Sequence, residues 1–184
     1  MLKRVLLIPG SPGVGKTTVL FKTTDMLKVK GFTEGGMPSR EVCSSRTRVG
    51  FEVLDMCLGK TGCHAHTNQK HGPQAGKYDV NFADLDDVGT QAVRKSNKEC
   101  DTAAVDEVGP MELFSEKSRN AAKDAVDSPK PVATIHWRTA VQIEKKIKAK
   151  QDAGIVVLAW ENRDSLPPAI SSKTMEYLAA TRLE

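Results

Sequence analysis

Residues 10–17 read Gly-Ser-Pro-Gly-Val-Gly-Lys-Thr and directly follow the apolar run of residues 5–8. This is a complete G-x-x-x-x-G-K-S/T phosphate-binding loop (Walker A), and its position after an apolar run predicts a strand, loop and helix in succession. Glycines at such a loop let the backbone curl so that successive N–H groups point at phosphate oxygens. The loop therefore predicts a nucleotide site and constrains the fold around it.

Different residues of the loop are expected to bind the phosphates and the metal ion. Lys16 is expected to neutralise the outer phosphates, and we count it as catalytic as well as binding. Thr17 offers a hydroxyl to Mg²⁺, and the helix that begins near Lys16 points its positive dipole end at the same anion. The predicted nucleotide-binding residues of this segment are Gly10, Ser11, Pro12, Gly13, Val14, Gly15, Lys16, Thr17 and Thr18. The chain is thus expected to bind a nucleoside triphosphate together with Mg²⁺.

A second predicted site lies at residues 102–107, where a short apolar run is closed by Asp106 and Glu107. An acidic side chain at the end of such a strand is suited to hold Mg²⁺ near the phosphates, because this hard cation prefers oxygen ligands. We assign that role to Asp106, and we assign Glu107 the role of general base that orients the attacking water. The alternative is that both acids only cap a helix that begins near Met111.

Two further segments carry candidate nucleotide contacts. Residues 132–136 read as a strand that ends in His136, which would sense the terminal phosphate; the alternative is an ordinary histidine at a strand end. Asn162 and Arg163 lie in a polar loop after residues 155–160 and are candidates to contact the base. No aspartate-based guanine signature is present, so both ATP and GTP remain open.

Alternating strands and helices predict an α/β fold of the P-loop NTPase class, with a mainly parallel sheet flanked by helices on both faces. At 184 residues the chain is expected to form a single domain, residues 1–184. Residues 41–42 and 49–54 predict an inserted β-hairpin around a polar turn. The remaining expected elements are a strand at 78–82, a helix from the cap Asp84 to before Cys100, a helix from Leu113 to Ala125, a basic helix at 140–150, a strand at 155–160 and a helix after Pro167 and Pro168.

Charge and composition argue against a nucleic-acid surface and against a membrane partner. The net charge of +4 is modest, and the densest basic run, residues 145–150, lacks the interleaved aromatics of a nucleic-acid surface. The longest apolar stretch is far shorter than the ~20 residues of a membrane helix, so we expect a cytoplasmic protein with no membrane partner. Soft ligands gather at Cys57, Cys63, His64, His66 and His71. A zinc site there is the minor alternative to a partly exposed strand and loop, because the spacing matches no common site.

Taken together, these motifs resemble the small THEP-type nucleoside-triphosphatase family over nearly the whole chain. Beyond the loop, the resemblance rests on residues 40–42, 48–52, 76–78, 105–114, 134–136 and 161–163, and the stretch 105–114 is the most distinctive. It implies a single RecA-like or related phosphate-loop domain that slowly hydrolyses several nucleoside triphosphates with Mg²⁺. By the same resemblance Lys16 and Thr17 match the phosphate and metal positions, Asp106 the acidic metal partner and Glu107 the catalytic carboxylate.

The chain also departs from that family. The family hairpin usually reads Arg-x-Gly-Gly-Arg-Arg where residues 43–48 read Cys-Ser-Ser-Arg-Thr-Arg, and Gln74 stands where an arginine is common. Arginine assistance from the hairpin is therefore in doubt. Two other classes use the same loop: a nucleotide or small-molecule kinase, and a nucleotide-dependent switch that binds a protein or nucleic acid. Glu107 and the lack of an arginine-rich lid favour hydrolysis.

Overall fold

The computed structural model describes residues 5–11, 13–106, 109, 111–128, 130–133, 151 and 153–181. Its centre is a five-stranded sheet in the order β10-β1-β9-β8-β2, in which each paired strand runs parallel to its neighbour. The strands are β1 (Val5–Leu7), β2 (Glu34–Met37), β8 (Thr102–Val105), β9 (Pro131–Ala133) and β10 (Ala153–Ile155). The expected parallel sheet is confirmed.

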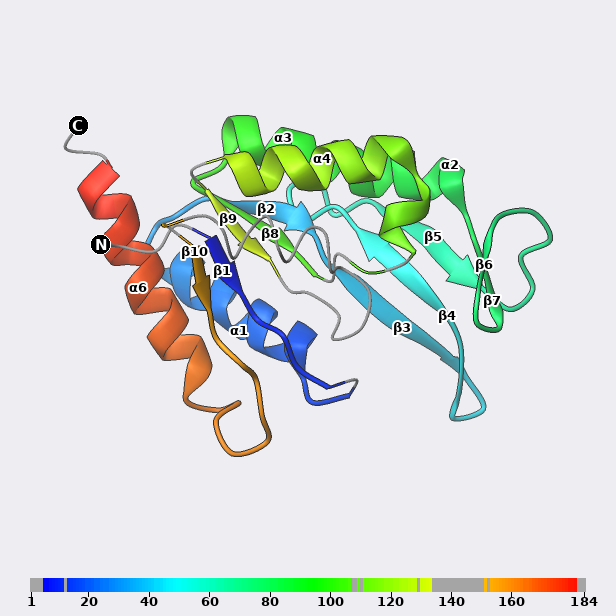
Figure 1. The fold of residues 1–184 in the computed structure, drawn as a ribbon, viewed down its shortest axis with the longest axis horizontal. Helices are drawn as coiled ribbons and strands as arrows, with labels where there is room; N and C mark the ends of the chain where they lie inside the picture. Colours follow the sequence, from blue (N-terminus) through cyan, green and yellow to red (C-terminus); the bar gives the residue numbers. More distant parts are fainter. Residues whose placement is uncertain are drawn as a thin grey trace.

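Helices cover both faces of this sheet (Figure 1). On one face lie α1 (Lys16–Val29) and α6 (Leu166–Thr181), and on the other lie α3 (Gln91–Glu99) and α4 (Glu116–Asp127). Successive residues of β8 serve the two faces, since Ala104 belongs to the apolar core with α1 and α6 whereas Val105 belongs to the core with α3 and α4. The all-buried strand β8 is therefore shared by both cores.

A second sheet of five strands, ordered β3-β4-β5-β7-β6, is antiparallel and extends from the end of β2 (Figure 1). The predicted hairpin is present as β3 (Ser39–Ser44) and β4 (Thr47–Leu54). Its two-residue turn, Ser45 and Arg46, has positive φ at both positions, 48° and 65°, as a tight hairpin requires. The insertion is larger than the expected hairpin, because β5 (Thr61–His66), β6 (Gln74–Ala75) and β7 (Tyr78–Val80) extend it.

The helix after this sheet starts earlier than the sequence suggested. The predicted strand at 78–82 stops at Val80, and the cap is Asn81 rather than Asp84, because the Asn81 side chain accepts a hydrogen bond from the Asp84 backbone N–H at 3.3 Å. Helix α2 (Phe82–Asp84) then continues through a π-helical turn, η1 (Leu85–Thr90), into α3. The predicted end before Cys100 is confirmed.

The predicted helix from Leu113 to Ala125 is interrupted. A 3-10 turn, η2 (Glu112–Phe114), comes first, and α4 begins only after Ser115, whose hydroxyl accepts from the Ser118 N–H at 3.2 Å. A fresh N-cap satisfies donors that a continuous helix would have paired internally. Residues 112–114 thus form a separate 3-10 turn before α4 rather than its first turn.

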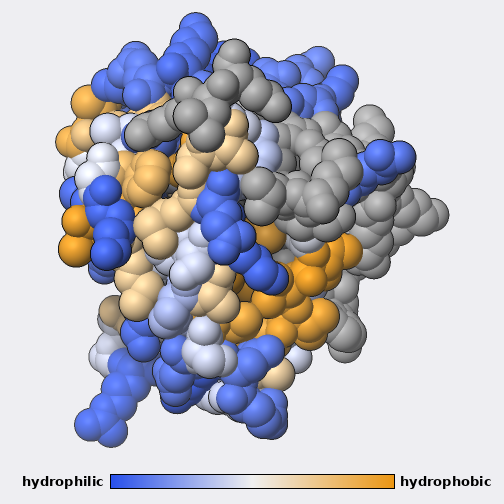
Figure 2. Space-filling model, turned by 90° about the vertical axis from the view of Figure 1, so that its left-hand side faces the viewer, coloured by the Kyte–Doolittle hydropathy of each residue, from blue (hydrophilic) through white to orange (hydrophobic). Residues whose placement is uncertain are grey.

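The strand predicted at 155–160 is also displaced. Strand β10 ends at Ile155, and beyond it only Leu158 pairs, through a single bridge to Gly10. Val157 and Trp160 point outward with 55% and 61% of their surface exposed, so this stretch is not an interior strand. Figure 2 views the side of the molecule that carries α6 and β10, where hydrophobic residues lie next to hydrophilic ones.

The last helix, α6, carries Pro167 and Pro168 in its first turn, where a backbone N–H has no helical partner to lose. Among the described helices, none is long and apolar enough to cross a membrane. The basic helix predicted at 140–150 lies outside the described residues.

Candidate nucleotide-binding site

The loop between β1 and α1 has the backbone that its glycines predict. Gly13 and Gly15 adopt φ of 79° and 103°, values that side chains rarely allow, and α1 begins directly after Gly15. Gly10 is needed for a different reason, since a Cβ there would lie 2.9 Å from Val14 Cγ1 and 3.0 Å from the Leu158 carbonyl oxygen. Close packing therefore requires a glycine at position 10, and the positive φ angles of Gly13 and Gly15 curve the backbone just before α1.

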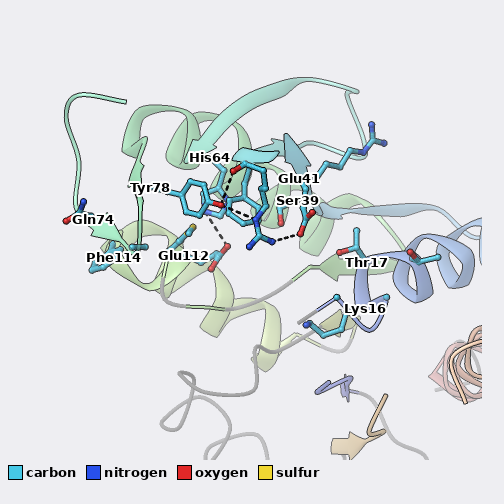
Figure 3. Close-up of a pocket in the computed structure, with 18 residues that line it drawn as sticks. Lys16, Thr17, Ser39, Glu41, His64, Gln74, Tyr78, Glu112 and Phe114 are labelled. Carbon is cyan, nitrogen blue, oxygen red and sulfur yellow. Dashed lines mark hydrogen bonds and ion pairs between the residues drawn. The ribbon is translucent and has the colours of Figure 1, made fainter. Parts of the chain in front are cut away.

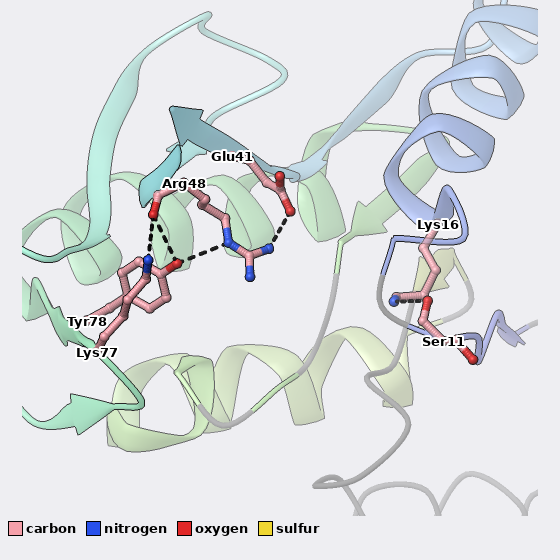
Figure 4. A network of polar contacts seen from close by, with 6 residues as sticks. All are labelled: Ser11, Lys16, Glu41, Arg48, Lys77 and Tyr78. Carbon is pink, nitrogen blue, oxygen red and sulfur yellow. Dashed lines mark hydrogen bonds and ion pairs between the residues drawn. The ribbon is translucent and has the colours of Figure 1, made fainter. Parts of the chain in front are cut away.

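Lys16 is the first residue of α1 and is buried, with 7% of its surface exposed. Its Nζ donates to the carbonyl oxygen of Gly10 at 3.2 Å. It also donates to that of Ser11 at 3.5 Å (Figure 4). The ammonium group therefore lies over the loop itself. Because the cap residue Gly15 has no side chain to accept from the first helical N–H groups, that end of α1 can offer its amides and its dipole to an anion.

Thr17 and Asp106 are the two oxygen donors that the sequence predicts for a metal. Thr17 lines the cavity beside the loop, and Asp106 follows the last residue of β8 with only 2% of its surface exposed. The Asp106 backbone N–H donates to the Met37 carbonyl at 3.1 Å, which fixes the strand end. A hydroxyl and a carboxylate are hard ligands of the kind Mg²⁺ takes alongside phosphate oxygens, so this donor set fits the ion. Pro12, Glu107 and His136 lie outside the described residues, and their roles stay predictions.

The two candidate base contacts, Asn162 and Arg163, make local contacts in the structure, and their role toward a base stays a prediction. The Asn162 side chain closes its own loop: its Oδ1 accepts from the Ala159 N–H and its Nδ2 donates to the Val157 carbonyl, each at 2.9 Å. The Arg163 guanidinium lies 4.9 Å from the centre of the Trp160 ring. Neither residue lines the cavity that adjoins the phosphate loop.

That cavity, of about 910 Å³, separates the phosphate loop from the antiparallel sheet (Figure 3). Its loop side is formed by Gly13 and by the first residues of α1, and its far side by β3, β4, β5, β6, β7 and η2. Such a volume is at the upper end of small-molecule sites, roughly 300 to 1,000 Å³.

An arginine projects from β4 on the far side of this cavity. Arg48 Nε donates to the Tyr78 hydroxyl at 3.0 Å, and Arg48 Nη1 donates to Glu41 Oε1 at 2.5 Å (Figure 4). Lys77 Nζ also donates to the Arg48 carbonyl at 2.9 Å. The hydrogen bond to Tyr78 is the main reason that the pKa of Arg48 is raised above its usual value. The guanidinium therefore has two side-chain partners, although 45% of the Arg48 side chain is exposed.

A buried polar pair lies deeper in the same cavity. His64 Nε2 lies 3.3 Å from Glu112 Oε1, and both side chains are almost fully buried. The other carboxylate oxygen of Glu112 accepts from the Gly109 backbone N–H at 2.9 Å. Burial lowers the pKa of His64 to about 4, so its imidazole is neutral at neutral pH. Glu112 therefore accepts from Gly109 with one carboxylate oxygen and faces His64 of the antiparallel sheet with the other.

Comparisons with known proteins agree with this geometry. Residues 5–171 match the family described as NTPase. The Nucleoside-triphosphatase THEP1 of Thermofilum pendens is 37% identical over 97% of this chain and 100% of its own length. That of Methanosarcina acetivorans is 38% identical over 93% of this chain and 97% of its own length. The chain belongs to the nucleoside-triphosphatase family.

Solved structures of this nucleoside-triphosphatase family show the same P-loop NTPase fold. The crystal structure of THEP1 from Aquifex aeolicus superposes with a TM-score of 0.77 at 30% identity, covering 91% of this chain and 97% of that one. The solution structure of a human cancer-related nucleoside triphosphatase gives 0.76 at 26% identity, covering 92% and 96%. The resemblance and the fold class predicted from the sequence are both confirmed.

The sulfur and imidazole residues weighed as a zinc site are dispersed in this member of the family. Cys57 Sγ contacts Cys100 Sγ at 3.4 Å, His64 faces Glu112, and His66 Nδ1 accepts from the Asn68 N–H at 3.0 Å. Among the described residues, no group of three or more His, Cys, Asp or Glu side chains is arranged to hold a metal ion.

Sequence reasoning identified the phosphate loop and Asp106 but not the far side of the cavity. Arg48 and Tyr78 belong to segments that carried the family resemblance, yet no role was attached to them. The sequence pattern offers His64 only as a possible metal ligand and assigns no role to Glu112. The available signal was the family-like spacing of residues 48–52, 76–78 and 105–114, which converge at this cavity.

Proposed function

We propose that this protein hydrolyses nucleoside triphosphates to diphosphate and phosphate in a Mg²⁺-dependent reaction, slowly and with little preference for the base. The observation that carries the proposal is the curled loop of Gly13 and Gly15 that leads into a buried Lys16, with the Asp106 carboxylate at the end of β8. Membership of the nucleoside-triphosphatase family supports the reaction class.

The residues of the chain divide the work of phosphoryl transfer. The loop amides and Lys16 bind and orient the phosphates, which is most of what such a reaction needs from a protein. Thr17 and Asp106 would hold Mg²⁺, which when bound neutralises charge on the outer phosphates. Glu107 is proposed to take the proton of the attacking water, on the ground of its place after Asp106 in the sequence.

Two features support slow turnover and broad specificity. The guanidinium of Arg48 is engaged by Glu41 and Tyr78, so part of its charge is already compensated. An arginine that is available to the transition state is worth about 10³ to 10⁵ in rate. The amide of Asn162 is used within its own loop and is therefore a poor reader of base edges.

The test is phosphate release from ATP, GTP, CTP and UTP, with Mg²⁺ and with a chelator. We expect release from all four only with Mg²⁺, at well below one turnover per second, and loss of release in Lys16→Ala. Lys28→Ala is the matched control, because Lys28 is an exposed lysine in the last turn of the same helix. Wild-type protein that releases no phosphate from any of the four would refute the proposal, as would release that is unchanged by the chelator.

A further inference from the structure

The cavity is lined on one side by the phosphate loop and the start of α1 and on the other by the antiparallel sheet and η2. In the sheet order β10-β1-β9-β8-β2, the phosphate loop follows β1, the Asn162 loop follows β10 at one edge, and the antiparallel sheet follows β2 at the other. If Asp106 at the end of β8 serves the metal, as proposed above, the outer phosphates point toward β8 and away from β10. The cavity under the antiparallel sheet therefore lies past the terminal phosphate, on the side opposite the Asn162 loop.

The far side of the cavity has aromatic surface suited to a planar ring. The Phe51 and Tyr78 rings pack edge to face with centres 5.2 Å apart and form the base of this wall, where Tyr78 is only 6% exposed and Arg48 covers Phe51. Phe114 lines it from η2 and keeps 41% of its surface exposed, which is unusual for a large apolar side chain in a pocket wall. A flat ligand would cover this surface, because aromatic rings favour offset-stacked and edge-to-face contacts.

The same wall offers cationic and neutral polar groups. Arg48 stacks on Phe51 at 5.1 Å and uses Nε and Nη1 on Tyr78 and Glu41, so Nη2 makes no hydrogen bond within the described part of the chain. A guanidinium placed in this way is suited to bind a phosphate or carboxylate. Arg40, exposed at the cavity edge, adds a second positive charge.

His64 points to a ligand independently of the arginines. It lines the cavity with only 2% of its surface exposed, and in the described structure neither ring nitrogen makes a hydrogen bond, although Nε2 lies near Glu112. Nε2 faces the Glu112 carboxylate at 3.3 Å, whereas Nδ1 has no polar partner in the described structure; a buried polar atom is normally paired, so Nδ1 calls for a partner. Figure 3 shows His64 and Tyr78 on the sheet side of the cavity, across from Lys16 and Thr17.

We propose that the sheet side of this cavity, across from the phosphate loop, is a second ligand site that binds a nucleoside monophosphate with its ring against Phe114 and its phosphate on Arg48. The proposal rests on the proposed function only for the direction in which the triphosphate lies. A nucleoside monophosphate fits because it joins one flat heteroaromatic ring to one compact dianion. His64 would complete a hydrogen bond to the sugar or to the ring edge.

The test is equilibrium dialysis of radiolabelled AMP, GMP, CMP and UMP against protein whose loop is saturated with Mg²⁺ and a non-hydrolysable triphosphate analogue. We expect one monophosphate bound per chain beside one analogue. Adenosine or guanosine, which lack the phosphate, and ribose 5-phosphate, which lacks the ring, should each bind at least tenfold more weakly than the best monophosphate.

Three substitutions test whether the monophosphate binds at the sheet side of the cavity. Arg48→Gln should weaken monophosphate binding about 10- to 100-fold, as expected for loss of a charged hydrogen bond. Phe114→Ala, a change at a half-exposed ring that leaves the core intact, should weaken it at least about fivefold. Arg94→Gln, at an exposed arginine of α3 away from the cavity, should leave it unchanged.

Several results would overturn the inference: a monophosphate that displaces the analogue, no binding while the analogue is bound, or binding that neither Arg48→Gln nor Phe114→Ala weakens. None of these depends on hydrolysis. Analogue binding and phosphate release on the same preparation report the proposed function separately, so a protein that hydrolyses triphosphates yet lacks the second site would refute this inference alone.

Discussion

Removing the ammonium group of Lys16 should abolish useful triphosphate binding without destabilising the protein. In the structure Lys16 Nζ has two carbonyl acceptors, at 3.2 and 3.5 Å, and the side chain is 7% exposed. A phosphate would replace these by charged acceptors, each worth about 1.5 to 3 kcal/mol. After allowance for the carbonyl contacts that are given up, we expect Lys16→Ala to lose about 3 kcal/mol of binding, roughly a 100-fold weaker Kd.

In the absence of nucleotide, Lys16→Ala should leave the stability of the folded protein unchanged or raise it slightly. Among the described residues, the hydrogen bonds of Lys16 Nζ go to neutral carbonyl groups; a buried cation so placed carries a desolvation cost, and its removal relieves that cost. We therefore expect Lys16→Ala to melt at or slightly above the wild-type temperature while calorimetric titration with a non-hydrolysable analogue shows the loss of affinity. An affinity within threefold of wild type would refute the phosphate-loop assignment, and the Lys28→Ala control should match wild type in both measurements.

The remaining predictions concern the metal, the base and a buried acid. Asp106→Asn and Thr17→Ala should each shift the Mg²⁺ titration of phosphate release to higher concentration; if both variants kept the wild-type curve, the metal roles would be wrong. Glu107→Gln should keep analogue and Mg²⁺ binding but lose about 10² to 10⁴ in rate, and near-normal release would remove Glu107 from catalysis. Burial, reinforced by Asp25 and Asp101, raises the pKa of Glu34 from 4.5 to about 8. The folded state therefore holds this proton more tightly than the unfolded chain, so stability should fall as pH rises from about 4.5 to 8, by at most about 5 kcal/mol. Glu34→Gln should flatten that part of a denaturation series against pH, and an unchanged slope would contradict the assignment.

The sequence predicted those parts of the fold in which a motif or an alternation of residues lies within the segment itself. The phosphate loop, the strand at 102–105 and the first hairpin each carry their own motif or alternation, and all three lie where they were expected. The cap was misplaced because Asn81 and Asp84 are both good N-caps and only the end of β7 decides between them. The residues around the two positions give no reason to prefer Asn81 over Asp84 as the N-cap.

The far side of the cavity could not be predicted because its residues contact one another across long distances in the sequence. Strand β5 reads Thr-Gly-Cys-His-Ala-His, which lacks the β-branched alternation of a strand and takes its conformation from pairing with β4 and β7. His64 meets Glu112 only because η2 packs against that sheet. No spacing rule relates two residues that approach each other through the tertiary fold.

One junction explains how the two sides of the cavity are held at a fixed separation. Strand β2 pairs with β8, and a Cβ on Gly36 would lie 1.8 Å from the Ala104 carbonyl oxygen, so only glycine allows the two backbones to come this close. One residue beyond β2, the Pro38 carbonyl accepts from the Leu54 N–H at 3.0 Å, where the antiparallel sheet begins. The strand that positions Asp106 is thereby bonded to the strand that leads into β3. Arg48 and Tyr78 are therefore positioned relative to the phosphate loop by backbone pairing rather than by a flexible connection, as a site that must accept a ligand in one orientation requires.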